Sequence, residues 1–534
     1  MPKRRIWNIF ISIFIFCLCA GGVVFYVGLI TATPAASEQP ERETREEIPE
    51  LRLYLNNTDL ATINSNGKDV KYPGNMARFV INEENYDFEN VEVKGRGNST
   101  WNSDKKPYQI KFDSKKNLFD LGKAKTWVLL ACYFDGSYIR NDVAFYLAQI
   151  LNMEYTNSGQ FVELYADDEY VGLYYLTQKV GVSNASAKLR NKNGVLMELD
   201  NIYAVEETRN YGTKNGDTFV LKDSVSDDEN DSEIGAIDFI DNYNQLQEAV
   251  WGKDWKRIEE LIDVDSFARY YILQIFTLNW DAFTTSNFFY KDGLDDKIHA
   301  GPAWDYDNTL GQWLETAFYR RSLQYNGLEV KVQSYLFFEL FEFPEFKEKV
   351  TQIVSRELLP NMETIMSHAE NTMEKISIPA IRDSEKWKRY NFYDEIQKLL
   401  SCIENRLEYF QIYYGNVEQL ENGNYLIKEL DDIYNFEQQS DKSYKITRRS
   451  DGKVLALSTG YTEYGGVIYT DWTDSIFEKW YISRDNEGKY YLFSKATESV
   501  LVLKDGYIQT EPLARAENEK FEIAEIGVFP LDTF

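Results

Sequence analysis

The stretch Gly301–Asp307, which reads Gly-Pro-Ala-Trp-Asp-Tyr-Asp, decides the fold of this chain. It places two carboxylates, Asp305 and Asp307, on a short turn that follows an aromatic run. Hard oxygen ligands at this spacing suit a divalent cation that also binds phosphate groups. On an extended segment, residues two apart point to the same side, so both carboxylates would share one cation. We expect Asp305 to be the primary metal ligand, with Asp307 as a second ligand or an orienting neighbour.

The residues just before this turn supply a base and an amide. Asn279–Asp281, which reads Asn-Trp-Asp, ends a helical pattern, and Asn287 opens the strand-like run Asn287–Lys291. Protein kinases use such groups in the same order: an Asp that accepts the proton of the substrate hydroxyl, an Asn that binds one Mg²⁺, and an Asp that bridges the metals. Asp281 is therefore the expected catalytic base and Asn287 a further metal ligand. Helix capping for Asp281 and a strand-entry turn for Asn287 are the alternatives.

A conventional kinase is excluded, because the His-Arg-Asp and Asp-Phe-Gly motifs are absent. Four upstream blocks nevertheless accompany the turn: Lys94–Trp101 (Lys-Gly-Arg-Gly-Asn-Ser-Thr-Trp), Lys105–Phe112 (Lys-Lys-Pro-Tyr-Gln-Ile-Lys-Phe), Tyr138–Asp142 (Tyr-Ile-Arg-Asn-Asp) and Gly172–Lys179 (Gly-Leu-Tyr-Tyr-Leu-Thr-Gln-Lys). In this order, and with the Asn-x-Asp segment and the Trp-Asp-Tyr-Asp turn, they resemble the spore-coat CotH kinase family, a group of atypical kinases. The resemblance spans roughly residues 50–412.

The resemblance implies a two-lobed, atypical protein-kinase-like domain that uses ATP and Mg²⁺ on a protein substrate. Two residues depart from the family pattern: Tyr306 stands where Phe is usual, and Gln178 stands where Glu is usual. Because Gln178 carries no charge, an ion pair that the family's Glu would form at this position is in doubt.

Four cationic side chains are the expected nucleotide-binding residues. In the alternating run Tyr108–Phe112, Lys111 lies on the face opposite the apolar set. If that face lines the cleft, Lys111 holds the nucleotide phosphates, and if it faces water, Lys106 or Arg140 takes this role. The Gly-x-Gly loop that carries Arg96 is suited to close over phosphates with its backbone N–H groups. A lone Gly-x-Gly is, however, more often a hairpin turn.

Composition excludes several classes of protein. The chain has 534 residues, 43% of them hydrophobic and 15% aromatic, which supports two or three domains with sizeable cores. A formal net charge of −28 argues against nucleic-acid binding, which needs clustered Lys and Arg. Only two histidines, His299 and His368, are available for Ser-His-Asp or Cys-His chemistry, and we expect His299 to be structural. Outside the N-terminal segment, Cys132 and Cys402 are too few for a zinc site, and we expect two separate buried thiols.

The N-terminus indicates a membrane anchor. Lys3–Arg5 precede an uncharged, mostly apolar run from Ile6 to Ile30, which exceeds the roughly 20 residues needed to cross a bilayer. We expect residues 1–30 to span the membrane once, with the basic N-terminus in the cytoplasm and the rest outside the cell. A cleaved signal sequence followed by secretion is the alternative. Residues 31–50 are expected to form a flexible acidic spacer.

The pattern along the chain predicts an α+β fold. We expect the kinase-like domain to span residues 51–415, with a β-rich first lobe that contains one helix at Ser137–Leu151. The run Asp223–Ser232 is expected to be a solvated loop. A helix begins at Asp263, where apolar residues start to recur at steps of three and four, and further helices follow from Val332 to Tyr414.

Residues 418–534 predict a small all-β domain. Short aromatic strands recur there, and Glu478–Ile482 is echoed 41 residues later by Glu519–Ile523. A period near forty suggests stacked or trefoil-arranged units. The pattern resembles a ricin-type β-trefoil lectin, although Gln-x-Trp has become Glu-x-Trp and Glu-x-Phe. Carbohydrate binding and a packing role without a ligand both remain open for this domain.

Together these features predict an extracytoplasmic atypical kinase that transfers the γ-phosphoryl group of ATP, with Mg²⁺, to Ser or Thr hydroxyls of a protein. The alternatives are a carbohydrate-active enzyme and a non-enzymatic, carbohydrate-binding cell-surface protein. The spacing of Asp305 and Asp307 argues against glycoside cleavage, since the two carboxyl groups of a glycosidase lie about 5 Å or more apart across the scissile bond.

Overall fold

A computed structural model describes most of the chain beyond the N-terminal segment. The described residues are 48–183, 186–279, 284–312, 335–415, 420–458, 466–485, 487–497, 499–511 and 517–526. Residues 1–45 and 46–534 are separate units. The predicted membrane anchor at 1–30, nearly all of the spacer and the predicted base Asp281 lie outside the described residues. Within the described ranges, no helix has both the length and the apolar character needed to cross a membrane.

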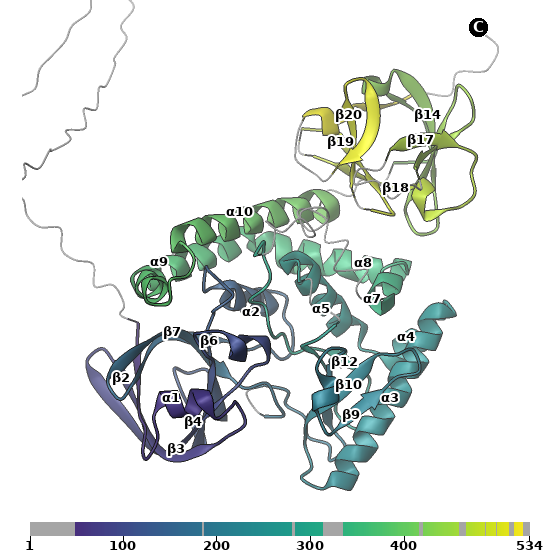
Figure 1. Ribbon diagram of the computed structural model, residues 1–534. Coiled ribbons are helices and arrows are strands. Elements are labelled where there is room, and N and C mark those ends of the chain that lie inside the picture. Colours follow the sequence, from purple (N-terminus) through teal and green to yellow (C-terminus); the bar gives the residue numbers. More distant parts are fainter. Residues whose placement is uncertain are drawn as a thin grey trace, which may run out of the picture. The chain divides into compact units, whose positions relative to one another are not determined.

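The first lobe is a closed barrel in the order β1-β2-β3-β4-β5-β7-β6 (Figure 1). Only the closing pair, β1 with β6, is parallel. Alternate residues of each strand fill the interior, and Tyr108, Ile110 and Phe112 are among them. The β-rich lobe and the alternation in this run are thus confirmed. The elements are β1 (Glu50–Tyr54), α1 (Leu60–Ser65), β2 (Tyr72–Ile81), β3 (Glu84–Gly95), η1 (Ser99–Asn102), β4 (Tyr108–Asn117), β5 (Lys123–Leu130), β6 (Gly159–Ala166) and β7 (Glu169–Gln178).

The predicted helix between β5 and β6 is α2 (Arg140–Ile150). It starts three residues later than expected, because Asp135 holds the preceding turn. The Asp135 carboxylate accepts from the backbone N–H and hydroxyl of Ser137 and from the backbone N–H of Arg140. The inner face of α2 belongs to the main core of the second lobe rather than to the barrel.

The second lobe contains its own sheet, which the sequence pattern did not separate from the first lobe. The sheet has the order β12-β11-β8-β10-β9, and α3 packs against β8 and β9. Its strand β11 confirms the predicted strand at Asn287–Lys291. These elements are β8 (Val195–Leu199), η2 (Ala204–Glu206), β9 (Asn210–Gly212), β10 (Thr218–Ser224), α3 (Glu229–Trp251), α4 (Trp255–Leu261), β11 (Asn287–Lys291) and β12 (His299–Ala300).

The predicted solvated loop at Asp223–Ser232 is wrong from Glu229 onward, where α3 begins. The Asp228 side chain caps the helix by accepting from the N–H of Asn230. Glu229 and Asp231 lie in the first turn, where the partial positive charge of the helix N-terminus stabilises carboxylates. The same acidic residues that suggest solvation are therefore the start signal of this helix.

The helix predicted after Asp263 is α5 (Val264–Thr277). Asp263 caps it by accepting from the N–H of Ser266, and the left-handed residue Leu278 ends it. The helices predicted from Val332 onward are also confirmed, and α9 and α10 lie along each other (Figure 1). They are α7 (Tyr335–Leu340), α8 (Pro344–Ile353), η3 (Val354–Leu358), η4 (Leu359–Asn361), α9 (Met362–Trp387), α10 (Phe392–Phe410) and η5 (Gln411–Gly415).

The C-terminal region is all-β, as predicted, and its strands pair antiparallel. Phe493 of this region packs on Tyr413 of the helical lobe, with ring centroids 5.2 Å apart. Lys495 pairs with both Glu342 and Asp441. The elements are β13 (Gly423–Ile427), η6 (Lys428–Leu430), β14 (Asp432–Gln438), β15 (Tyr444–Arg448), β16 (Val454–Leu457), β17 (Val467–Thr470), η7 (Ile476–Glu478), β18 (Lys479–Arg484), β19 (Tyr490–Ser494), β20 (Val500–Lys504), β21 (Tyr507–Glu511), η8 (Glu517–Glu519) and β22 (Ile523–Glu525).

Candidate active site

The Gly301–Asp307 segment leaves β12 as an irregular turn. Asp305 is exposed, Asp307 is partly buried and Tyr306 between them is fully buried. Asp305 has a left-handed backbone conformation, with φ 69°. The expectation that both carboxylates point to one side of an extended segment is therefore wrong, because strand alternation does not apply to a left-handed residue. Ser286 Oγ donates to Asp305 Oδ2 at 2.8 Å and holds this carboxylate at the end of the turn.

Arg96, from the Gly-x-Gly loop of the barrel, reaches this turn from the first lobe. Its guanidinium lies over the Trp304 ring, 5.5 Å from the centroid. Burial lowers the pKa of Arg96, while Asp305, Asp307 and Glu198 oppose that effect. The guanidinium thus lies over the residue that precedes Asp305, where the charges of all three carboxylates act on it. The structure therefore brings together three residues predicted from the sequence: Arg96, Asp305 and Asp307.

The loop that carries Arg96 depends on glycine at its start. A Cβ on Gly95 would lie 2.3 Å from the Trp101 ring, so a larger residue would push the loop away from this position. The backbone N–H of Arg96 also donates to the Pro107 carbonyl at 3.2 Å. These contacts fix the backbone on both sides of the guanidinium.

Sequence reasoning missed an ion pair between a buried carboxylate, Glu198, and the exposed Lys222. Lys222 of β10 and Glu198 of β8 lie 2.8 Å apart. Burial raises the pKa of Glu198, which Lys222 counteracts, and the charges of Asp200 and Asp305 raise it further. The signal in the sequence was the single charge in the apolar run Val195–Leu199. A lone carboxylate in a buried strand needs a partner, and such pairs cluster at functional sites.

Lys179 follows β7 and adds a further cation to this neighbourhood. Although its side chain is exposed, desolvation by the surrounding protein lowers its pKa, Asp223 opposes the effect, and the cations Lys94, Lys222 and Arg96 lower it further. Neighbouring cations destabilise the charged form of a lysine. An anionic group that binds beside Lys179 would therefore stabilise its charged form.

Asn287, predicted as a metal ligand, is buried at the start of β11. Its Oδ1 accepts from the Tyr270 hydroxyl at 2.6 Å, and its Nδ2 donates to the Thr285 carbonyl at 2.5 Å. Thr285 in turn donates to Asp200 at 3.0 Å. The amide oxygen of Asn287 thus has a protein partner, and its role at a metal stays a prediction.

The two predicted nucleotide-binding lysines, Lys111 and Lys106, lie on the barrel and next to its Trp101, respectively. Lys111 is half-buried on the outer face of the barrel, opposite Glu92 and Thr126 on the neighbouring strands. Lys106 Nζ donates to the carbonyls of Trp101 and Ser103 at 2.7 and 3.1 Å. The roles of both lysines at phosphates stay predictions.

Arg140 is fully buried and paired with Asp135 at 2.5 Å. It also donates to the Thr309 carbonyl at 2.8 Å. Arg140 therefore ties the turn before α2 to the segment that follows the Asp305–Asp307 turn. Its Nη2, in contrast, is buried without a hydrogen-bond partner among the described residues, and the role of Arg140 at phosphates stays a prediction.

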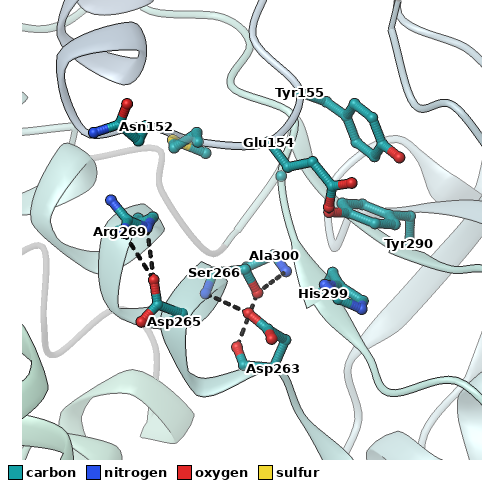
Figure 2. A pocket seen from close by; sticks show the side chains of 12 residues that line it. Asn152, Glu154, Tyr155, Asp263, Asp265, Ser266, Arg269, Tyr290, His299 and Ala300 are labelled. Atoms are coloured by element: carbon teal, nitrogen blue, oxygen red, sulfur yellow. Dashed lines mark hydrogen bonds and ion pairs between the residues drawn. The ribbon is translucent and has the colours of Figure 1, made fainter. Parts of the chain in front are cut away.

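A polar cavity of about 220 Å³ lies on the other side of β12, next to Gly301 (Figure 2). Glu154 accepts there from the Tyr290 hydroxyl at 2.9 Å, and the His299 ring stacks on Tyr290 with centroids 4.8 Å apart. Burial lowers the pKa of His299, but hydrogen bonding and charge from Asp296, with the charges of Asp263 and Glu154, raise it overall. These contacts give His299 the packing and partner of a structural residue, as expected.

Metal chemistry at the Asp305–Asp307 turn would rest on few protein ligands. Across the described ranges, no group of three or more His, Cys, Asp or Glu side chains is arranged to hold a metal ion. Mg²⁺ commonly binds one or two carboxylates, with phosphate oxygens and waters completing its shell. Asp305 and Asp307 fit that pattern. Cys132 and Cys402 are free and buried, which confirms two separate thiols.

Comparisons with known proteins agree with the motifs. Residues 93–410 match the family described as CotH kinase protein. Inner spore coat protein H of Bacillus subtilis (strain 168) is 22% identical over 397 residues, which cover 69% of this chain and 98% of that protein.

Two solved structures are similar to parts of the chain. The designed 3-fold symmetric protein ThreeFoil is 14% identical, with a TM-score of 0.18, over 21% of this chain and 89% of that one. A mosquitocidal holotoxin is 16% identical, with a TM-score of 0.19, over 20% of this chain and 18% of that one.

Proposed function

The chain belongs to the CotH kinase protein family, which implies an atypical kinase, and from this premise we propose that it transfers the γ-phosphoryl group of ATP to Ser or Thr hydroxyls of a protein. The observation that carries the proposal is the position of Arg96 of the barrel over Trp304, directly before Asp305 of the second lobe, where the charges of Asp305 and Asp307 act on it. Phosphoryl transfer relies on positioning and charge neutralisation more than on covalent chemistry. A cation facing two carboxylates between two lobes supplies both.

Asp305 and Asp307 are the residues that would hold Mg²⁺, whose charge would neutralise the phosphate oxygens of ATP. Arg96 contacts the phosphates from the first lobe, and Lys179 adds positive charge beside it. Lys111, Lys106 and Arg140 are second-tier candidates for the same role. The amide oxygen of Asn287 has two lone pairs, so it can complete the metal shell while it accepts from the Tyr270 hydroxyl.

In the transfer step, the acceptor hydroxyl oxygen forms a bond to the γ-phosphorus. The bond from that phosphorus to the bridging oxygen of the β-phosphate breaks, and ADP leaves with the electron pair. Asp281 accepts the hydroxyl proton and orients the oxygen in line with the breaking bond. Burial raises the pKa of the free Cys132 thiol and keeps it protonated, so that it is a poor nucleophile, which agrees with direct transfer.

We place this activity outside the cytoplasm, anchored by residues 1–30, on the basis of Lys3–Arg5 and the long apolar run that follows. Protease added to intact cells tests this topology. Digestion of residues 51–534 while a cytoplasmic marker survives is the expected result. Protection of these residues until the cells are lysed would overturn it.

Thermal stability with nucleotide is the direct test of the proposed function. ATP with Mg²⁺ at about 100 times its dissociation constant stabilises the folded state by about 2.7 kcal/mol. We expect this shift with ATP and Mg²⁺ together, and a smaller one in the Arg96→Met variant. A carbohydrate-active enzyme or a non-enzymatic adhesin predicts no shift with nucleotide. An unchanged melting temperature across saturating ATP and Mg²⁺ would overturn the proposal.

A further inference from the structure

Helix α5 carries two polar side chains, Tyr270 and Gln274, among its mostly apolar buried residues. Tyr270 and Gln274 are one helical turn apart, so their side chains lie one above the other on the same face of the helix. Each is 1% exposed. Buried polar groups need fixed hydrogen-bond partners, because water is not available to replace them.

The partners of this pair come from all three segments of the proposed active site. Gln274 Nε2 donates to the Tyr306 hydroxyl at 2.8 Å, and Asn279 Nδ2 donates to Gln274 Oε1 at 2.9 Å. The Tyr270 hydroxyl donates to Asn287 Oδ1 at 2.6 Å. Tyr306 lies between the two metal-binding carboxylates, and Asn279 opens the Asn-Trp-Asp segment that ends in the proposed base.

The partners of Gln274 and Tyr270 are buried as well. Tyr306 is 0% exposed, and Asn141 of α2 accepts its backbone N–H at 2.9 Å. Asn279 and Asn287 are buried as well. A buried hydrogen bond between neutral groups has a narrow range of good geometry, so each partner fixes the position of the other. The amide of Gln274 thus joins the metal-binding turn to the Asn-Trp-Asp segment through a single side chain.

We infer that Gln274 and Tyr270 are positioning residues of the transferase, which set the register of the metal-binding turn, the Asn-Trp-Asp segment and Asn287 against one another. The inference rests on the proposed function, since it names what aligns that site. Neither side chain contacts the reacting atoms in this arrangement. Their effect on rate is indirect, because a misplacement of about 1 Å in a reacting group costs on the order of 10²-fold in rate.

A purely structural role predicts a different pattern of effects. If the pair only satisfies buried polar groups, its loss lowers stability, and activity falls only as much as in any variant of equal stability. If the pair positions the site, kcat falls while the affinity for nucleotide stays the same. The readout that separates the two is therefore kcat against the dissociation constant for ATP with Mg²⁺, compared at matched stability.

The test uses Gln274→Met and Tyr270→Phe, which remove the hydrogen bonds and keep the length or the ring of the side chain. Thr277→Val on the same helix is the matched control. Thr277 is fully buried and its hydroxyl donates to the Leu273 carbonyl at 2.8 Å, within the helix itself. This hydroxyl also donates to the Gln274 backbone carbonyl at 3.3 Å. The control therefore removes only bonds to backbone carbonyls of α5 and keeps the side-chain hydrogen bonds of Tyr270 and Gln274.

We expect kcat to fall about 10-fold or more in Gln274→Met and in Tyr270→Phe, with the dissociation constant for ATP within about twofold of that of the wild type. Thr277→Val should lose stability and keep its kcat. Equal kcat in all three variants and an active wild type would overturn the inference and leave the proposed function standing.

If the wild type transfers no phosphate, the proposed function is contradicted but the inference is not. Hydrogen exchange of the backbone amides then tests the inference by itself. In Gln274→Met, the backbone amides of residues 305–310 should exchange about 10-fold faster than in the wild type, since one buried anchor of the turn is gone. Thr277→Val should leave these amides unchanged. Equal exchange in both variants would overturn the inference independently of activity.

Discussion

Replacing Lys105 by methionine is expected to lower the free energy of unfolding by about 3–5 kcal/mol. Lys105 and Asp383 of α9 are 1% and 2% exposed, and their charged atoms lie 2.9 Å apart. The pair joins the barrel to the helical lobe. Without the lysine, the Asp383 carboxylate would remain buried and unpaired, although it would still accept from the Leu173 N–H and the Tyr138 hydroxyl. These two donors place the expected cost near the lower end, at about 3 kcal/mol.

A second substitution, at Asp383, tests whether the unpaired buried charge causes the loss of stability. In Lys105→Met combined with Asp383→Asn, the buried charge is gone. The amide oxygen can still accept from the Leu173 N–H, and the amide NH2 can donate to the Tyr138 hydroxyl, which rotates to accept. The double variant should therefore be about 2 kcal/mol more stable than Lys105→Met alone. Lys115→Met, an exposed lysine on β4, is the control and should change stability by less than about 0.5 kcal/mol.

Urea unfolding followed by tryptophan fluorescence measures these differences. A loss of about 3 kcal/mol lowers the folding equilibrium constant by a factor of about 10², well above experimental error. The Pro107 carbonyl, two residues after Lys105, accepts from the Arg96 N–H, so the affinity for ATP should weaken as well. A loss under about 1 kcal/mol in Lys105→Met, or a double variant that costs the sum of both single variants, would refute the reasoning.

Three further outcomes follow from the electrostatics and the packing. His299 should titrate above about 6.5 in an NMR experiment assigned with His299→Gln, because Asp296 and nearby carboxylates outweigh the effect of burial on its pKa. The stability that the charged His299 contributes is fully present below about pH 6.5, and it is lost as the pH rises through the higher pKa of the folded state. A measured pKa of about 6.5 or less for His299 would contradict this. Arg96→Met should weaken ATP binding about 10-fold in calorimetry yet strengthen binding of Mn²⁺ alone, since the carboxylates lose their cation; changes of the same sign would contradict the geometry. Phe493→Ala should cost about 3–5 kcal/mol and Tyr507→Ala, whose ring is 76% exposed, almost nothing; equal midpoints would show that Phe493 does not anchor the C-terminal region.

The elements with a strong local pattern could be predicted from the sequence. The recurrence of apolar residues after Asp263 predicted α5, and the alternation in Tyr108–Phe112 predicted the inward face of β4. Both patterns arise because one face of the element is buried. Each residue in the run is therefore apolar or polar according to the face on which it lies. The run Asp223–Ser232 was misread because acidic residues mark both solvated loops and helix starts, and only the apolar face that follows separates the two.

The site could be predicted in part. Motif order identified Arg96, Asp305 and Asp307, which the fold brings together. The pairing of Glu198 with Lys222 could not be predicted, because it depends on which strands of the second sheet are neighbours. The left-handed conformation of Asp305 could not be predicted either. A single left-handed residue other than glycine does not change the periodicity of the sequence. Gln274 was not singled out from the sequence, because the segment that contains Tyr306, one of its partners, is distant in the sequence.

Transfer of labelled phosphate from ATP to a Ser- and Thr-containing protein acceptor, in wild type and Asp305→Asn side by side, tests the central claim most directly. The substitution removes a metal-binding charge from an exposed carboxylate that accepts from the Ser286 hydroxyl, a bond that the amide oxygen can keep, so the fold should be retained. We expect Mg²⁺-dependent transfer by the wild type and a loss of about 10²-fold or more in the variant. A folded Asp305→Asn protein that transfers phosphate at the wild-type rate, with the same dependence on Mg²⁺, would contradict the account.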